Sequence, residues 1–94
     1  MVQWKPALFL IVSLLADTAW ADIFQLVDRN SGYYVSYAPL YINSKLQGYT
    51  DKYGRIKISL PAGNYQGQVE YQRRRKNITL PIDGSAQLKV INVM

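Results

Sequence analysis

The feature that most constrains this chain is apolar–polar alternation in two neighbouring runs. Residues 55–60 read R-I-K-I-S-L, and from Tyr65 to Tyr71 the apolar and small residues again fall on every second position. Alternation with a period of two indicates a β-strand with one buried face. Turn residues precede the first run at 51–54 (D-K-Y-G) and separate the two runs at 61–64 (P-A-G-N). The stretch therefore predicts a β-hairpin with one dry face.

Other apolar segments predict the remaining strands. They lie at 23–27, 33–37, 40–42, 78–82 and 88–93, with turn residues between them. Pro39 cannot donate to a ladder and marks an edge or a break. In the last segment the alternation slips, which a bulge or a strand buried on both faces would explain. About seven short strands and no amphipathic helix predict an all-β fold, a small antiparallel β-sandwich.

The central stretch also resembles a known family. The pattern T-D-x-x-G-x-I-x-I-x-L-P-x-G-x-Y, followed by V-x-Y, is similar to the carboxypeptidase regulatory-like domain, a transthyretin-like (prealbumin-like) β-sandwich. The matching positions are Thr50, Asp51, Gly54, Ile56, Ile58, Leu60, Pro61, Gly63, Tyr65, Val69 and Tyr71. The family's usual Gly-Tyr pair after the second strand is replaced by residues 73–76, R-R-R-K. The resemblance implies an accessory module without catalytic residues of its own.

The first residues read as a leader. Lys5 precedes an apolar run at 7–15, and residues 19–21 (A-W-A) form a small-residue cleavage site, which predicts a signal peptide at 1–21 and one domain at 22–94. The alternative is an uncleaved membrane anchor, but the run is about half of the ~20 residues a spanning helix needs. The chain has no cysteine, and small secreted domains of oxidising compartments usually carry disulfides. We expect an exported bacterial protein, periplasmic or at the cell surface, with no transmembrane span after cleavage.

The chain contains few of the side chains that enzymes use for catalysis. There is no His and no Cys, so the commonest general base and the usual transition-metal ligands are missing. The carboxylates of residues 22–94 are scattered, and three of them lie in or beside turns. A calcium loop at 51–54 is disfavoured because Lys52 would bring a positive charge into it. We expect no enzyme, no cofactor and no metal site.

A run of four cations is the sharpest candidate site. Arg73, Arg74, Arg75 and Lys76 follow the second alternating strand, in a loop or at the start of the next strand. Adjacent like charges repel one another and are favoured beside an anionic partner. A solvated loop that protects an edge strand, or a general contribution to the net charge of +5, explains the same run.

Tyrosine is the second candidate feature. All eight tyrosines lie after the leader, too many for so small a core. Tyr65 and Tyr71 fall on the predicted dry face, where core packing accounts for them. Tyr33, Tyr34 and Tyr53 are the candidate contact residues, because exposed tyrosine offers contact area with a hydrogen-bonding tip. A plain surface strand without a binding role explains the same residues.

Three functions follow from these features, the third being a small inhibitor or chaperone-like factor. The first is a non-enzymatic exported module that binds a protein partner in a cell-envelope assembly, as an accessory or structural subunit. The second is a recognition module that binds an anionic glycan or lipid head groups through the basic cluster. Nucleic acid is a poor candidate partner, because an exported protein seldom meets it.

Overall fold

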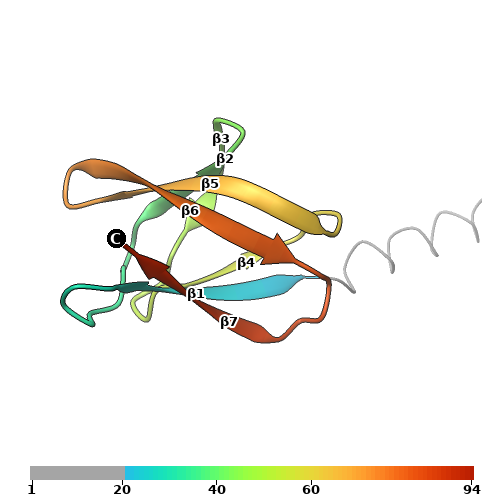
Figure 1. Cartoon of the computed structure of the whole chain (residues 1–94), viewed down its shortest axis with the longest axis horizontal. Coiled ribbons are helices and arrows are strands. Elements are labelled where there is room, and N and C mark those ends of the chain that lie inside the picture. Colours follow the sequence, from blue (N-terminus) through green and yellow to red (C-terminus); the bar gives the residue numbers. More distant parts are fainter. Residues whose placement is uncertain (1–20) are drawn as a thin grey trace, which may run out of the picture.

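Seven strands form two stacked sheets in this computed structural model, which describes residues 21–94 (Figure 1). In chain order they are β1 (Asp22–Asp28), β2 (Pro39–Ile42), β3 (Lys45–Tyr49), β4 (Arg55–Ile58), β5 (Gly63–Tyr71), β6 (Arg74–Ile82) and β7 (Leu88–Val93). One sheet has the order β4-β1-β7 and the other the order β3-β2-β5-β6. The prediction of a small all-β sandwich is confirmed.

The strands are not all antiparallel. β1 pairs antiparallel with β4 but parallel with β7, in an unbroken register from Ile23 opposite Leu88 to Asp28 opposite Val93. In the other sheet every pairing is antiparallel, with a register shift in β2 between Leu40 and Tyr41. The last strand therefore reaches its place by crossing from one sheet to the other after β6.

The core lies between the two sheets and is built by the alternation of each strand. β1 contributes Phe24 and Leu26, which are fully buried, and β5 and β6 contribute Val69 and Leu80 from the facing sheet. Ile58 is also buried, whereas Lys57 on the opposite phase is exposed, as the alternation predicts. The buried apolar set is Phe24, Leu26, Val35, Ala38, Leu40, Ile42, Ile56, Ile58, Val69, Ile78, Leu80, Ile82 and Val93.

The predicted hairpin in the central stretch is wrong. β4 and β5 are consecutive but lie in different sheets, so residues 59–62 carry the chain across the sandwich instead of joining two paired strands. Both strands bury one face in the same core, which is why their alternation matches a hairpin equally well. The hairpins of the four-stranded sheet are instead β2–β3 and β5–β6, each closed by two residues.

Two further expectations need correction. Residues 33–37 form no strand: Tyr34 makes an isolated bridge with Val27, and Tyr37 adopts a φ of 54°. β7 has neither a bulge nor two buried faces. It turns Ile91 and Val93 toward the core, and Leu88 and Val90 face outward.

The predicted leader at 1–21 and the alternative of a membrane anchor lie, except for Ala21, outside the described part of the chain. Within residues 21–94, no helix is long and apolar enough to cross a membrane.

Candidate functional site

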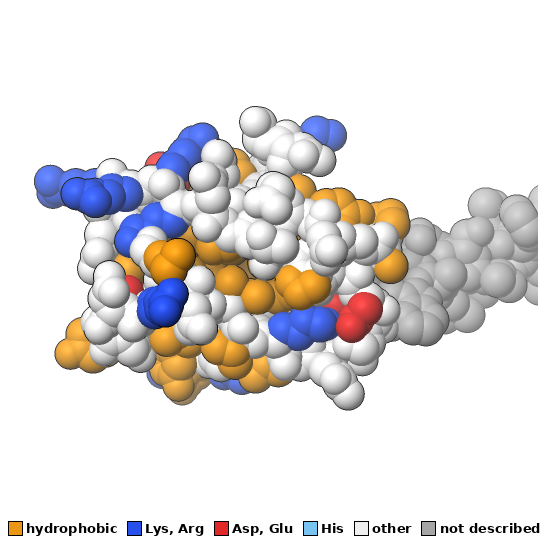
Figure 2. Space-filling view, viewed as in Figure 1, with side chains coloured by type: hydrophobic (Ala, Val, Ile, Leu, Met, Phe, Trp, Pro, Cys, Tyr) orange, Lys and Arg blue, Asp and Glu red, His pale blue; other side chains and the backbone are white. Residues whose placement is uncertain are grey.

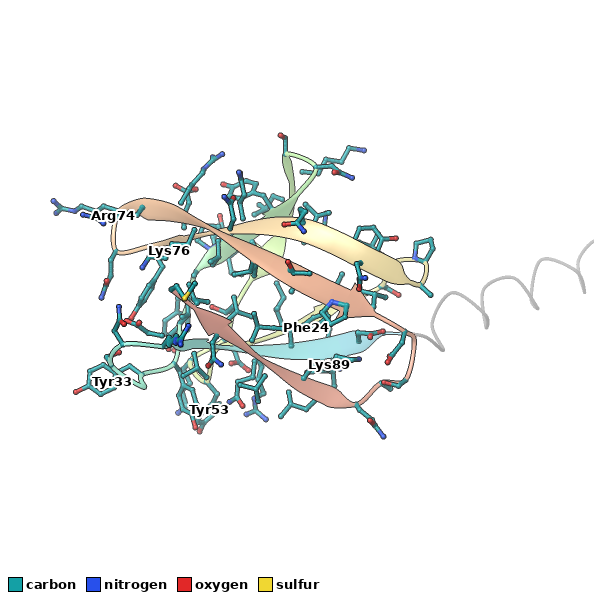
Figure 3. All side chains as sticks on the ribbon, viewed as in Figure 1. Phe24, Tyr33, Tyr53, Arg74, Lys76 and Lys89 are labelled. Atoms are coloured by element: carbon teal, nitrogen blue, oxygen red, sulfur yellow. The ribbon has the colours of Figure 1, made fainter. Side chains whose placement is uncertain are left out.

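Three connections and the C-terminus meet at one end of the sandwich, which we call the loop end. β1, β3, β5 and β7 all finish there, so residues 29–38, 50–54 and 72–73 lie together with Met94. Figure 3 shows Arg74 at the tip of the β5–β6 hairpin, with Tyr33 and Tyr53 at the same end of the molecule. The sheet registers therefore bring the predicted tyrosines and part of the basic cluster to one surface.

A buried threonine holds the first loop in place. Thr50 is 1% exposed, and its hydroxyl donates to the carbonyl of Val35 at 2.6 Å and accepts from the amide of Ala38 at 2.8 Å. The amide of Thr50 in turn donates to the Ala38 carbonyl at 2.9 Å. Because buried polar groups are costly to leave unpaired, these bonds fix residues 35–38 against the start of the second loop.

The second loop is an Asx-type turn built on Asp51. Its carboxylate accepts the amides of Tyr53 at 2.8 Å and Arg55 at 2.9 Å. The amide of Arg55 is the largest cause of the lowered pKa of Asp51, with the amide of Tyr53 acting in the same direction. Gly54 closes the turn with a φ of 75°, and a Cβ there would lie 2.5 Å from the carbonyl oxygen of Leu26. Only glycine fits this position, so the turn residues serve the fold.

A half-buried polar cluster joins the first loop to the β5–β6 hairpin. Asp28 is 5% exposed and accepts the amide of Asn30 at 3.0 Å, which is the main cause of its lowered pKa. Lys76 adds a favourable charge interaction that lowers the same pKa. Burial raises the pKa of Tyr71, and the charge of Asp28 and a hydrogen bond to it raise that pKa further. Lys76 lies on the inward phase of β6, where its charge favours the ionised form of Asp28.

Exposed aromatic rings cover the loops. Tyr33 and Tyr37 are 73% and 68% exposed, and Tyr34 and Tyr53 are about half exposed. The rings of Tyr34 and Tyr53 meet edge to face with centroids 6.1 Å apart. Arg55 lies over the Tyr53 ring at 4.8 Å, with Lys52 at 5.1 Å from the same centroid. The loop scaffold thus presents large amphipathic side chains on a fixed backbone.

The four consecutive cations divide among three positions. Arg73 lies in the two-residue turn, and Arg74 begins β6 at the tip. Among residues 21–94, neither has an acidic partner within ion-pair distance. Lysine and arginine side chains project beyond this hairpin at the left of Figure 2.

Arg75 takes no part in the loop end. It points to the outer face of the four-stranded sheet, 3.9 Å from Glu70, and lies over the Tyr41 ring at 4.9 Å. A hydrogen bond to Glu70 is the largest cause of the raised pKa of Tyr41. The cluster that the sequence presents as one unit is therefore two exposed arginines, one lysine beside Asp28 and one arginine on the sheet face.

At the opposite end, which we call the Asp22 end, the charged side chains of one cluster pair with one another. Asp22 is fully buried and accepts the amides of Asp83 at 3.1 Å and Gly84 at 2.9 Å. Lys89 reaches Asp22 at 2.7 Å and Asp83 at 3.0 Å, and these two carboxylates raise its pKa, Asp22 most strongly. Hydrogen bonds to Ser85 and Lys89 hold the pKa of Asp83 well below its usual range. This cluster ties the start of β1 to the loop before β7.

Two concave sites among the described residues are small. One pocket of about 210 Å³ is lined by Ile23, Asp51, Arg55, Ile56 and Lys57. A second, of about 180 Å³, is lined mainly by polar residues around Tyr41 and Gln68. Ligand pockets usually span roughly 300–1,000 Å³. Across residues 21–94 no three His, Cys, Asp or Glu side chains gather to hold a metal ion.

Sequence reasoning missed several members of the loop end. Arg29 lies in the first loop, where its guanidinium donates to the sulfur of Met94 at 2.9 Å, and Lys52 lies in the second loop. Tyr37, the second most exposed tyrosine, also belongs here. Arg29 and Lys52 lie within turn segments that the sequence shows, and Tyr37 lies in a segment predicted as a strand. Knowing that these segments share an end requires the strand order.

Comparison with protein-family models, with curated proteins and with solved structures found no match to this chain. The resemblance to the carboxypeptidase regulatory-like domain therefore stays a prediction from sequence.

Proposed function

We propose that the protein is a non-enzymatic binding module, an accessory or structural subunit that contacts a protein partner in the cell envelope through the loop end. The observation that carries this proposal is the gathering of exposed tyrosines with arginines that have no acidic partner among residues 21–94, on loops held by hydrogen bonds. Tyrosine and arginine are enriched at protein interfaces. Loops rich in Tyr, Ser, Gly and Asn on a β-sandwich are also the binding apparatus of antibodies.

The fixed conformation of the first loop also supports this proposal. Binding loses free energy when loops and side chains must be ordered, so a loop already fixed in place binds at lower cost. Residues 29–38 are fixed by Thr50 at one side and by Asp28 at the other. Tyrosine adds large contact area with few rotatable bonds. The loop end thus combines a fixed backbone with side chains suited to contact.

Backbone strain in the turn of the β5–β6 hairpin also supports a binding role for the loop end. Gln72 and Arg73 close the β5–β6 hairpin with φ values of 53° and 64°, the φ pattern of a type I′ turn. Asn-Gly is the preferred pair for this turn, and the left-handed conformation costs other residues about 1–2 kcal/mol each. Strained residues cluster at functional sites. An arginine kept in a position that favours glycine supports a role for its side chain in binding.

A second candidate function rests on one specific observation. Arg73 and Arg74 have no acidic partner among residues 21–94, so their guanidinium groups are free to pair with phosphate or carboxylate groups. An anionic glycan or a lipid head group would suit these two side chains. Such a ligand engages the arginines more than the tyrosines, which provides the means to tell the two functions apart.

The proposal is tested by capture from envelope extract with purified wild-type protein and two variants. One variant combines Tyr33→Ser with Tyr37→Ser, and the other combines Arg73→Ser with Arg74→Ser. Lys45→Ser with Lys57→Ser is the control, because it removes the same charge away from the loop end. We expect a specific protein to be captured by wild type and control, and at least tenfold less by both loop-end variants.

The lipid or glycan alternative predicts a different result. Vesicles with an anionic phospholipid, or an isolated acidic polysaccharide, would bind the wild type without any protein, with strong salt dependence. The arginine variant would lose this binding and the tyrosine variant would keep most of it. Equal capture by all variants and the control would refute both functions for the loop end.

A further inference from the structure

Three of the four edge strands carry features that discourage strand addition. β6 contains Pro81 and begins with cations. β3 begins with Lys45 and has an extra residue, Gln47, where its pairing with β2 shifts register. β4 exposes Arg55 and Lys57. Charges, proline and bulges at sheet edges block pairing with another chain. β7 has no proline and no bulge, and its one charged residue, Lys89, lies on the inward phase of the strand.

The outward row of β7 is apolar. Leu88 is 49% exposed and Val90 is 58% exposed, and Asn92 completes the row. Leu88 lies opposite Ile23 of β1, so the apolar surface continues onto the next strand. A regular edge strand with an apolar outward row is suited to accept a further strand.

The single charge of β7 does not protect this edge. Lys89 points inward, is 20% exposed and is neutralised by Asp22 and Asp83. An inward charge discourages pairing only when a neighbouring strand would leave it buried without a partner. Here both partners belong to the same chain, so Lys89 stays paired whatever lies beyond β7.

We propose that β7 pairs antiparallel with β7 of a second copy of this chain about a two-fold axis, which joins the two three-stranded sheets into one. A register centred on Val90 places Val90 opposite Val90 and Leu88 opposite Asn92. Directly opposed side chains interact most strongly in a sheet, and like charges there destabilise it. This register opposes no like charges, and the interface is isologous as a two-fold axis requires.

The distribution of charge favours this arrangement over others. Most of the basic side chains lie at the loop end, where β7 finishes, namely Arg29, Lys52, Arg55, Arg73, Arg74 and Lys76. Antiparallel pairing directs the two loop ends away from each other, so the positive surfaces are kept apart. A parallel or end-to-end association would bring them together. If the loop end binds as proposed above, the dimer is bivalent and gains avidity toward a repeated partner.

The first experiment measures the oligomeric state of the purified protein alone by sedimentation velocity over a range of concentrations. We expect the wild type to double its molar mass with increasing concentration. Val90→Lys should stay monomeric because two lysines would face each other at the axis. Thr79→Lys is the matched control, since it adds the same charge to an outward position on edge strand β6, and it should dimerise as the wild type does.

A second measurement identifies the contact itself. The chain has no cysteine, so Val90→Cys supplies one thiol per molecule. We expect Val90→Cys to form a disulfide-linked dimer under mild oxidation, because directly opposed Cβ atoms in an antiparallel pair lie about 4.5–5.5 Å apart. Thr79→Cys should remain largely unlinked.

Several results would overturn the proposal. They are a wild type that stays monomeric at every concentration, a Val90→Lys variant that dimerises normally, and equal cross-linking at the two cysteine positions. Because these measurements need no partner, they are independent of the loop-end function. The variant with Arg73→Ser and Arg74→Ser should dimerise normally, which separates failure of this interface from failure of the loop end.

Discussion

The two ends of the sandwich treat charge in opposite ways. At the Asp22 end, a buried carboxylate, a second carboxylate and Lys89 satisfy one another within 2.7–3.0 Å. At the loop end, Arg73 and Arg74 reach into solvent, and the buried groups there, Thr50 and Asp28, bond to the loop backbone. Charges that are satisfied internally stabilise the fold, whereas charges left without a partner are available to another molecule. The difference supports our proposal that the Asp22 end serves stability and the loop end serves binding.

The largest effect in this comparison is expected at Asp22. Asp22→Ala removes the acceptor of two backbone amides and the closest partner of Lys89. Because the carboxylate is fully buried, the loss should lower the free energy of unfolding by roughly 2–4 kcal/mol. Urea unfolding followed by circular dichroism measures this change.

Asp51→Ala is the matched control at the loop end. Asp51 also accepts hydrogen bonds from two backbone amides, but its side chain is 52% exposed. In Asp51→Ala, water can therefore bond to the amides that lose their acceptor. We expect a clearly smaller destabilisation. Equal losses for Asp22→Ala and Asp51→Ala would remove the contrast between the two ends.

A smaller loss of stability is expected for a substitution at Thr50, which should also weaken binding. Thr50→Val keeps the shape of the side chain but leaves the Val35 carbonyl and the Ala38 amide without their side-chain partner. The cost should be about 1–3 kcal/mol, and capture of the partner should fall because the first loop loses its support. Thr79→Val, on an exposed position of β6, should stay within about 0.5 kcal/mol of wild type. Unchanged capture by a destabilised Thr50→Val would show that binding does not need the loop to be fixed.

From the sequence, the buried face of each strand can be predicted more reliably than the pairing of the strands. Alternation identifies Ile58 and Val69 as inward residues, and both are buried. It says nothing about pairing, because a strand shows the same period whether its successor lies beside it or in the facing sheet. Sheets pack about 10 Å apart, a gap that a few residues such as 59–62 can span. The mistaken hairpin follows from that ambiguity.

Of the two turns that close hairpins, the β2–β3 turn contains Asn43, a typical turn residue, whereas the β5–β6 turn carries a weaker signal. Gln72 and Arg73 adopt positive φ without a Gly or an Asn, so propensity does not mark them as a turn. The exposed row of β7 misleads in the same way, since Leu88 and Val90 suggest burial but face outward. In both places local preference disagrees with the fold, and such disagreements are expected at functional sites.

The candidate site is predictable from sequence only in part. Composition shows that tyrosines must reach the surface, and the run at 73–76 marks a basic feature. Their grouping at one end depends on strand order and register, and so does the separation of Arg75 and Lys76 from the exposed pair. Without that order, Arg29 and Tyr37 cannot be connected to the site.

The smallest effect is expected at Arg73, where stability and binding should change in opposite directions. Arg73→Gly and Arg73→Ala remove the same charge, but only glycine relieves the strain of a φ of 64°. We expect Arg73→Gly to be more stable than Arg73→Ala by about 1 kcal/mol, the lower limit for a left-handed residue. Thermal unfolding of the two variants, side by side, measures the difference.

Both variants should capture less partner than the wild type, to a similar extent, because the lost guanidinium is common to them. A glycine variant that is more stable than the wild type yet binds less would mean that the chain keeps arginine at the cost of stability, as functional residues often require. If Gly and Ala are equally stable, the turn is not strained and this support for a functional tip is lost. If Arg73→Gly binds as the wild type does, Arg74 and the tyrosines must account for the contact alone.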